Sequence, residues 1–454
     1  MSMQSVEKEK LHEQYRKEHT TINEGEVKKL NRAFTPRGKC ISFVFLLIYI
    51  FAIWHFTARA ERWYLLGGLM FFYMLVKKIF ALMYRPCKKE LTKHYKVTAM
   101  VTCYNEKPTS VVSILDNIMA LDYPVHEIIF LDDGSKDTLA FEVAKSFAEA
   151  HKNDENAPSF QIVRYEENRG KRGVLHDGFQ LATGDYVFLL DSDSEILPNA
   201  LTELLRPFED GKTTSCVGHI GVLDKKQNYL TKLQSIKYFS AFQLGRAAQS
   251  VTGDVVVCSG AFSLHKMDFI MQHLEGIRKT TLLGISVSAG DDRAITYFSK
   301  MSGGKTRYQN TAYCETEVPN KLRALISQRR RWQRSAYIAS LTAVRDMFPR
   351  NIWFLLWSVA DTYFWLIATI LFIISVMERG FYFDLRDVVL YHFIIMYAHN
   401  GFYLLYRPLQ FLFTPIYSFF YGLLLLYTRI YAAITIKYDG WGTRGAGLKR
   451  DASD

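Results

Sequence analysis

The stretch YVFLLDSD, from Tyr186 to Asp193, places an apolar run directly before two carboxylates. A short apolar run between polar segments is typical of a strand that is buried on both faces. Asp191 and Asp193 then fall at the carboxyl end of that strand, the edge at which α/β sheets bind their ligands. This stretch therefore predicts both a parallel sheet and the place of its site.

Further apolar runs of the same kind lie on both sides of Tyr186–Leu190. They occur at Val97–Thr102, Glu127–Leu131 and Gln161–Arg164, and they alternate with helical patterns at Thr138–His151 and Val174–Ala182. Alternating strands and helices are the signature of a parallel sheet with crossover helices. The fold class predicted for the central part of the chain is therefore α/β and Rossmann-like.

Polar motifs follow three of these four strands where the strand ends. Cys103-Tyr104-Asn105-Glu106 follows the first run, and Asp132-Asp133-Gly134-Ser135 follows the second. One Asp-Gly motif is common as a turn, and Asp132 and Asp133 alone could simply cap one. Polar motifs at three successive strand ends indicate a binding site.

Two more clusters suggest the chemistry, namely Gly290-Asp291-Asp292 and Gln328-Arg-Arg-Arg331-Trp332. A nucleotide-sugar donor leaves as a diphosphate, so its site needs carboxylates for a divalent cation, a carboxylate base for the acceptor hydroxyl, and guanidinium groups for the departing charge. The non-catalytic alternatives are that the arginines form a solvated or headgroup-binding face and that Trp332 is an interfacial tryptophan. The acids and arginines together favour sugar transfer.

The apolar segments before the sheet predict a membrane protein. Ile41–Phe56 and Trp63–Tyr84 have about the length of two tilted spans. The first lies behind roughly forty polar residues and lacks a small-residue cleavage site, which argues against a signal peptide. Lysine and arginine flank the pair on both sides, so both ends are expected in the cytosol.

The basic balance and the cysteines exclude other classes. The net charge is +11, but much of it flanks apolar segments, and no basic stripe interleaved with aromatics indicates a nucleic-acid partner. The six cysteines are scattered without a C-x-x-C pair, so we expect reduced thiols rather than a zinc site or a disulfide framework.

The motifs occur in the order found in processive, membrane-integrated inverting glycosyltransferases with a GT-A domain, and the sequence most closely resembles bacterial-type hyaluronan synthases. The resemblance runs from about Lys96 to Arg444 and is carried by Tyr104-Asn105-Glu106, Asp132-Asp133-Gly134-Ser135, Gly170-Lys171-Arg172, Asp191-Ser-Asp193-Ser194, Arg246-Ala-Ala-Gln249-Ser250, Cys258-Ser259-Gly260, Gly290-Asp291-Asp292-Arg293, Gln328-x-x-Arg331-Trp332 and Trp441-Gly442-Thr443-Arg444. Chitin and chitooligosaccharide synthases share most of this pattern.

The resemblance implies a role for each matching residue. Asp292 resembles the general base, with Asp291 beside it, and Asp193 resembles the ligand of Mg²⁺ or Mn²⁺. Ser259, Gly260 and Trp332 resemble the acceptor site. The positions implied to bind the nucleotide are Tyr104, Glu106, Asp132, Lys171, Arg172, Asp191, Gln328, Arg331, Trp441 and Arg444.

Three positions depart from the family pattern. Ala261 stands where proline is usual, Gly245 where an acid is usual, and Ser327 where glutamine is common. These departures bear on the preference for donor or acceptor more than on the reaction.

The C-terminal third is expected to return to the membrane. Asn320–Met347 predicts interfacial amphipathic helices, and Trp353–Met377 and Val388–Tyr406 predict two spans. If Trp441–Arg444 meets the nucleotide, it is cytosolic, so Phe411–Ile436 is interpreted as re-entrant or interfacial. Asp361, His392 and His399 could line a polar path or form a structural pair.

We therefore expect six segments: 1–40, a cytosolic N-terminal segment; 41–84, two transmembrane helices; 96–318, the GT-A domain; 319–350, interface helices; 351–436, transmembrane and re-entrant helices; and 437–454, a cytosolic gating segment. The implied function is processive synthesis and translocation of hyaluronan from UDP-GlcNAc and UDP-GlcA. The protein is expected in the plasma membrane with its catalytic domain in the cytosol. Its expected partners are the nascent polysaccharide and membrane lipids, and no nucleic acid is expected. A UDP-GlcNAc-only synthase of the chitin type, a non-processive membrane glycosyltransferase and a non-catalytic scaffold are the alternatives.

Overall fold

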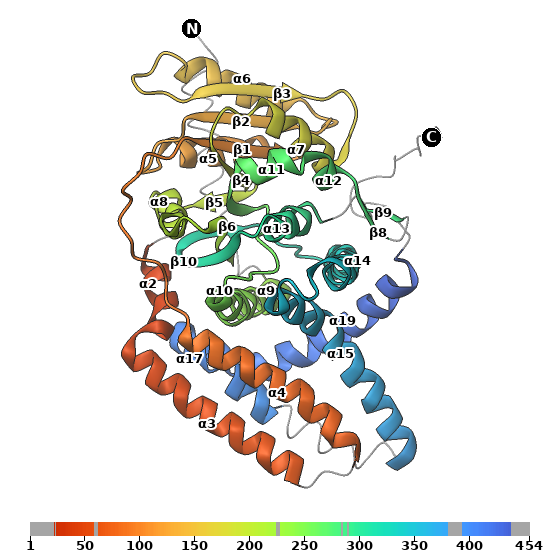
Figure 1. Ribbon diagram of the computed structural model, residues 1–454. Helices are drawn as coiled ribbons and strands as arrows, with labels where there is room; N and C mark the ends of the chain where they lie inside the picture. The colour runs from red at the N-terminus through yellow and green to blue at the C-terminus, as the bar shows by residue number, and fades with distance from the viewer. Residues whose placement is uncertain are drawn as a thin grey trace.

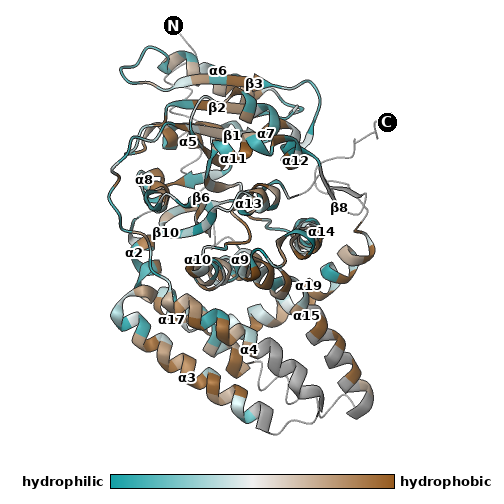
Figure 2. Ribbon diagram, viewed as in Figure 1, coloured by the Kyte–Doolittle hydropathy of each residue, from teal (hydrophilic) through white to brown (hydrophobic). Residues whose placement is uncertain are grey.

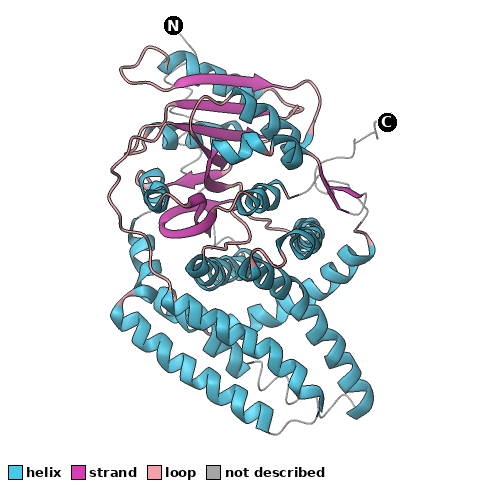
Figure 3. Cartoon of the chain, viewed as in Figure 1, coloured by secondary structure: helices cyan, strands magenta, loops and turns pink. Residues whose placement is uncertain are grey.

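The computed structural model describes residues 22, 24–58, 62–223, 228–282, 285–287, 290–379 and 393–436. All the strands lie in the upper part of the molecule and the longest helices in the lower part (Figures 1 and 3). Residues 1–21, 380–392 and 437–454 lie outside the described part. The predicted N-terminal segment and the C-terminal motif therefore remain largely predictions.

An eight-stranded sheet, ordered β3-β2-β1-β4-β7-β6-β10-β5, forms the centre of the upper part. Its strands are β1 (Val97–Cys103), β2 (Glu127–Asp132), β3 (Ser159–Arg164), β4 (Tyr186–Asp191), β5 (Ser194–Ile196), β6 (Thr213–Val222), β7 (Phe262–Lys266) and β10 (Lys305–Thr316). The four strands predicted from the sequence are β1 to β4, and they pair in parallel as expected.

The register of these four strands brings their polar ends together. Cys103 on β1 is opposite Asp132 on β2, and Asp132 is opposite Arg164 on β3. On the other side of β1, Thr102 is opposite Asp191 on β4. The motifs that follow these strands therefore start from one aligned edge.

The other half of the sheet is mixed rather than parallel. β7 runs antiparallel to both β4 and β6, and the short β5 runs antiparallel to the end of β10. β7 starts directly after the Cys258-Ser259-Gly260 segment, so the antiparallel strand leads away from the edge where the parallel strands end. The prediction of a parallel sheet is confirmed for β1 to β4 only.

Strand alternation divides the core of the domain into two layers. Ala99 and Val101 face a cluster that includes Ile114 on α5 (Pro108–Met119). Met100 faces the opposite cluster, with Phe179 on α7 (Gly170–Leu181). This alternation is the period of two that the pleat of a strand imposes.

The remaining helices of the upper part are α6 (Leu139–His151), α8 (Ala200–Leu205), α11 (Met267–Gln272), α12 (Leu274–Arg278) and α13 (Asp291–Met301), and a separate hairpin is formed by β8 (Thr280–Leu282) and β9 (Ile285–Val287).

The lower part is a set of apolar helices (Figure 2). Its members are α3 (Pro36–Ala58), α4 (Arg62–Met83), α15 (Ile352–Arg379), α17 (Gly401–Tyr406), α18 (Pro408–Phe411) and α19 (Thr414–Ile434). Among the described residues, two stretches are long and apolar enough to cross a membrane, Pro36–His55 in α3 and Thr414–Ile434. These two helices fit a membrane-embedded protein.

Helices at the junction connect the two parts. α14 (Leu322–Met347) is a single helix over the predicted interfacial segment Asn320–Met347. The junction also contains the N-terminal α2 (Glu24–Asn31) and η1 (Arg32–Phe34), and the succession α9 (Tyr229–Phe239), η3 (Ser240–Arg246) and α10 (Ala247–Thr252), which the sequence analysis did not predict. α19 is a continuous helix, and the helical path before it is interrupted at Arg407 and around Phe413. The re-entrant interpretation of Phe411–Ile436 stays a prediction.

The connection from α4 to β1 is extended and lies against the sheet domain. Glu209, in η2 (Arg206–Asp210), accepts hydrogen bonds from the Thr92 amide at 3.0 Å and the Tyr95 hydroxyl at 2.6 Å. Gln309 on β10 accepts from the Cys87 amide and donates to the Cys87 carbonyl. The largest hydrophobic cluster continues across this junction, from Val101 in the sheet to Tyr403 in α17. The two parts therefore share one core.

Glu127 links three segments at the amino end of the sheet. Its buried Oε1 accepts hydrogen bonds from the Thr98 hydroxyl at 2.6 Å, the Thr183 amide at 2.5 Å and the Gly184 amide at 3.2 Å. Burial alone would raise the pKa of Glu127, but these hydrogen bonds outweigh burial and lower it.

We predict that Glu127→Gln lowers the melting temperature by about 5 °C or more at neutral pH, because the amide presents donors to groups that already donate. A lowered carboxyl pKa stabilises the fold above the ordinary value of 4.5, and this contribution is lost as the pH falls through the pKa of folded Glu127. The difference between the two proteins should therefore shrink in acid. Differential scanning fluorimetry measures both effects, with Glu149→Gln, at an exposed position, as the control. An equal shift in the control would contradict this role.

Candidate active site

Lys171 lies at the centre of the predicted site, between two acidic segments. It stands in the first turn of α7, and its ammonium group pairs with the Asp191 carboxylate at the end of β4. The same ammonium lies 3.9 Å from Asp291 Oδ2 at the start of α13. Burial alone would lower the pKa of Lys171, but the two carboxylates outweigh it and raise the pKa. Lys171 thus stays charged and draws β4 and α13 together.

Gly260 lies against the same group. A Cβ at this position would be 3.2 Å from Asp291 Oδ2 and 3.5 Å from Lys171 Nζ. The backbone of the predicted acceptor segment therefore passes directly beside the acid cluster, where a side chain would be crowded. Ser259, the preceding residue, is half-buried, and its carbonyl accepts the Phe262 amide at 3.1 Å.

Asp292, next to this group, has an electrostatically unusual setting. Burial raises its pKa and the adjacent Asp291 raises it further, against the opposing effect of Arg293 and Lys171. Its Oδ1 accepts a hydrogen bond from the Arg293 amide at 2.8 Å. A carboxylate with a raised pKa is a stronger base than one in water.

Thr296 connects Asp292 to the predicted acceptor segment. Its hydroxyl donates to the Asp292 carbonyl at 2.7 Å and accepts from the Cys258 amide at 2.9 Å. Because Thr296 is fully buried, this bridge is shielded from water. The first turn of α13 and the Cys258-Ser259-Gly260 segment are therefore held as one unit.

Gly290 fixes α13 against α14. Its φ is +83°, in the left-handed region that favours glycine, and a Cβ there would lie 1.9 Å from Ser335 Oγ. Arg172 of α7 donates to the Gly290 carbonyl at 3.0 Å. Gly290 is thus required for both the backbone conformation and the close approach of the two helices.

The contact with Ser335 also orients α14. Gln328, Arg331, Trp332 and Ser335 share one face of this helix by their spacing. Since Ser335 faces Gly290, this face of α14 is the one turned toward the start of α13. Trp332 is 38% exposed, which leaves much of its ring available to a ligand, while the Arg329 guanidinium lies 4.3 Å from the ring centroid.

Asp193 has the charge environment expected of a cation ligand. Burial raises its pKa well above the ordinary value, and the nearby Asp191, Glu106 and Glu317 carboxylates add to the effect. Its Oδ1 accepts the Thr316 hydroxyl at 3.0 Å. Among the described residues no group of three or more His, Cys, Asp and Glu side chains could hold a metal ion alone. Such a site suits an ion that also takes phosphate oxygens as ligands.

The predicted nucleotide residues of β1 and β2 lie at the neighbouring strand ends. Asp132 is fully buried, and its Oδ1 accepts the Ser135 amide at 3.0 Å. Arg164 Nε, at the end of β3, lies 3.6 Å from Asp132 Oδ2. The carboxylates of Asp132 and Glu106 both act on the Cys103 thiol, where burial and then these charges raise the pKa to about 12. Tyr104 is half-buried in the same loop.

Sequence reasoning missed four residues that support the site. Arg164 carried a usable signal, because it ends a predicted strand. Thr316 ends β10, a strand not predicted from the sequence, while Thr296 and Ser335 lie within helices and carry no signal of their own. Trp441 and Arg444 lie outside the described residues, so their predicted approach to the nucleotide stays a prediction.

The chain is similar to known proteins over most of its length. Residues 98–274 match glycosyl transferase family 2. A hyaluronan synthase of Streptococcus pyogenes serotype M1 is 31% identical over 407 residues, which cover 89% of this chain and 96% of that one. Hyaluronan synthase 3 of Xenopus laevis is 28% identical over 382 residues, 77% of this chain and 68% of its own. An N-acetylglucosaminyltransferase of Mesorhizobium japonicum is 27% identical over 258 residues, 57% of this chain and 59% of its own.

A solved structure supports the fold independently. The mannosyltransferase PcManGT from Pyrobaculum calidifontis, solved with GDP-Man and Mn²⁺, matches with a TM-score of 0.56 at 20% identity, over 87% of this chain and 99% of that one. This likeness shows the GT-A fold. The extent and identity of the Streptococcus match show more, and the chain belongs to the hyaluronan synthase family of glycosyltransferases.

Proposed function

We propose that this chain synthesises hyaluronan processively from UDP-GlcNAc and UDP-GlcA and passes the growing polymer across the membrane. The observation that carries the proposal is the cluster of Lys171, Asp191, Asp291 and Gly260, which brings the donor side and the acceptor side of a transfer site together. The relatives named hyaluronan synthase support the choice of product.

Asp292 is the proposed general base. Its raised pKa makes it a competent acceptor for the proton of the attacking hydroxyl as the new glycosidic bond forms. The acceptor oxygen attacks the anomeric carbon, the bond to the diphosphate breaks, and UDP leaves with the electron pair. Lys171 remains charged beside Asp191 and offers that departing charge a cation. Arg331, with its planar fork of donors, is proposed to bind the diphosphate.

The residues around Asp193 fit a divalent cation. Burial and the neighbouring Asp191, Glu106 and Glu317 carboxylates raise the pKa of Asp193, so a cation between Asp193 and the diphosphate would stabilise the charged carboxylate. Mg²⁺ or Mn²⁺ bound there would neutralise the leaving group, and PcManGT was solved with Mn²⁺. Asp193 would hold the ion, and Thr316 would orient the Asp193 carboxylate.

Buried polar groups in the helices next to this site support a route for the polymer. Gln243 is fully buried in η3, and both of its amide atoms lack a hydrogen-bond partner among the described residues. Two nitrogens of buried Arg329 are likewise unpaired within that part of the chain. Burial and then the charges of Arg329 and Arg429 lower the pKa of Lys237 to about 7. Buried groups without partners are costly, and sugar hydroxyls and uronate carboxylates would satisfy them.

The family departures have structural settings that leave the transfer chemistry intact. A side chain at Gly245 would point toward Lys77 of α4, 3.7 Å from its Cε, rather than toward the donor. Lys77 pairs instead with Asp361 of α15. Ala261 contributes its carbonyl, which accepts the Ser194 hydroxyl at 3.4 Å, and proline offers the same carbonyl.

A synthase of the chitin type that uses UDP-GlcNAc alone is the second candidate. The Mesorhizobium N-acetylglucosaminyltransferase, which matches over 57% of this chain, favours it. A uronate carboxylate would need a cation beside it, and we propose Lys171, Arg172 and Arg293, which lie at the acid cluster, for this role; their presence favours hyaluronan.

The donor requirement tests the function. We expect purified protein to make high-molecular-mass polymer only with UDP-GlcNAc and UDP-GlcA together, and hyaluronidase to degrade it. Size-exclusion chromatography of the products formed from each donor alone and from both gives the answer. Polymer from UDP-GlcNAc alone that resists hyaluronidase would move the assignment to the chitin type.

Substitutions of the two acids separate cation binding from base catalysis. Asp193→Asn should abolish turnover and weaken UDP binding in the presence of Mn²⁺, because a cation ligand is lost. Asp292→Asn should slow transfer about 100-fold or more and leave UDP affinity nearly unchanged, because the base acts only in the transition state. Isothermal titration with UDP and a UDP-release assay measure these effects. Equal loss of UDP binding in both variants would contradict the division of roles.

Trp332→Ala should retain slow hydrolysis of the donor but lose elongation, because the exposed ring provides an apolar face for the terminal sugar. The matched control is Trp332→Phe, which keeps a smaller aromatic face and should keep part of the elongation. Released UDP and polymer length, measured in the same reaction, distinguish the two activities. Polymer of normal length from Trp332→Ala would refute an acceptor role.

A further inference from the structure

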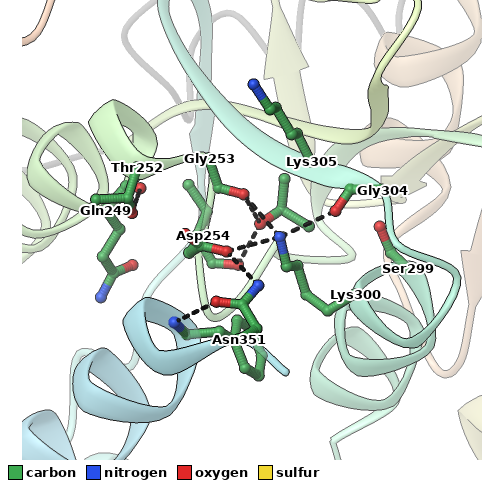
Figure 4. A network of polar contacts seen from close by, with 12 residues as sticks. Gln249, Thr252, Gly253, Asp254, Ser299, Lys300, Gly304, Lys305 and Asn351 are labelled. Atoms are coloured by element: carbon green, nitrogen blue, oxygen red, sulfur yellow. Dashed lines mark hydrogen bonds and ion pairs between the residues drawn. The ribbon is translucent and has the colours of Figure 1, made fainter. Parts of the chain in front are cut away.

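A buried ion pair far along α13 from Asp292 has no part in the chemistry described so far. Lys300, in the last turn of α13, lies 2.6 Å from Asp254 Oδ1, and each side chain is only 5% exposed. The ammonium also donates to the Gly253 carbonyl at 3.0 Å and the Gly304 carbonyl at 2.9 Å (Figure 4). All three donors of this buried charge are therefore used.

Asn351 joins this pair to α15. Its amide donates to Asp254 Oδ1 at 2.8 Å, and its own Oδ1 accepts the Phe354 amide at 3.0 Å (Figure 4). The second bond is an N-cap of α15. One side chain thus begins the apolar helix and binds the carboxylate that pairs with α13.

α15 holds the same segment at two further points. Trp357 Nε1 donates to the Thr252 hydroxyl at 3.3 Å, and Gln249 donates to Asp361 Oδ2 at 2.9 Å. Residues 249–254, which form the end of α10 and the turn after it, are therefore attached to α15 by hydrogen bonds. The contacts span more than two turns of α15, from its cap to Asp361.

The held turn leads directly into the acceptor side of the site. Four residues after Asp254, the Cys258 amide donates to Thr296, whose hydroxyl donates to the Asp292 carbonyl. α13 is thereby joined to this segment at two points, by Thr296 in its second turn and by Lys300 in its last. A shift of residues 252–254 relative to the sheet acts on both the acceptor segment and the helix of the base.

We propose that the Lys300–Asp254–Asn351 network is a positioning site through which α15 sets the placement of Asp292 relative to the acceptor. The inference rests on the proposed function, in which Asp292 is the base and the polymer passes from the site into the helices. A buried ion pair is weak support for stability, because desolvation offsets much of the attraction. Here the ion pair instead fixes the position of α13 relative to the turn and to α15.

Asn351 is the position at which the network can be weakened without removing the cap. Asn351→Ser keeps a capping oxygen but is too short to reach Asp254, and Asn351→Asp keeps the cap while facing Asp254 with a second carboxylate. Tyr95→Phe is the matched control, because the buried Tyr95 hydroxyl donates to Glu209 at 2.6 Å and joins the segment before β1 to η2, outside residues 249–254, α13 and α15.

With both donors present, we expect kcat for elongation to fall about tenfold in Asn351→Asp and less in Asn351→Ser, while donor KM and UDP affinity stay within about twofold. Tyr95→Phe should leave kcat within about twofold, although its melting temperature falls by about as much as that of the Asn351 variants. Melting curves for every variant show whether folding is intact. If Asn351→Asp does not fold, Thr252→Val, which removes the acceptor for Trp357, carries the same expectation.

A double-mutant cycle tests whether the effect passes through Thr296. The losses in kcat from Asn351→Asp and Thr296→Val should be non-additive, whereas those from Tyr95→Phe and Thr296→Val should multiply. Additive losses in the first cycle, unchanged kcat in both network variants, or an equal loss in Tyr95→Phe would overturn the inference. If the wild-type protein makes a polymer other than hyaluronan, the product assignment fails alone, and the same comparison is made with the donor that the enzyme uses.

Discussion

The rest of the site depends on how half-buried carboxylates are kept together at one edge of the sheet. Asp191, Asp193, Asp291 and Asp292 come from a strand end and a helix start that lie far apart in the sequence, and burial makes their mutual repulsion stronger. Lys171 is placed where one ammonium group meets Asp191 and Asp291. Asp193 and Asp292 keep raised pKa values. The charge around Asp193 therefore suits a bound cation, and the raised pKa of Asp292 suits a proton acceptor.

The first half of the sheet could be predicted from the sequence because its information is local. Each of β1 to β4 is an apolar run that ends in a polar motif, and parallel pairing aligns those ends. The antiparallel β7 could not be predicted in this way, because its direction depends on the loop before it and on pairing with both β4 and β6. β6 and β10 were missed for a related reason. Their polar residues, such as His219 and Gln309, are buried in side-chain networks that only the tertiary fold supplies.

The same contrast applies to the site. Asp191, Asp193 and Asp132 follow strands and were predictable, whereas the tie between Asp292 and Cys258 depends on Thr296, whose helical surroundings give no hint of it. Roles assigned by resemblance, such as those of Ser259 and Arg331, needed the family pattern. The geometry adds a cause for some of them, since the closeness of Gly260 to Asp291 and Lys171 explains why that position has no side chain.

The hydrophobic core that continues from β1 into α17 has a practical consequence for handling the protein. Two transmembrane proteins with equal spans can differ in whether their soluble part survives when the spans are disturbed. Here Val101 and Tyr403 belong to one cluster, so a detergent that enters between the lower helices also loosens the packing beneath the sheet. The catalytic part is accordingly not a detachable unit. A chain cut at the start of β1 would expose apolar surface on the side that now faces α4 and α17, and it would be expected to aggregate.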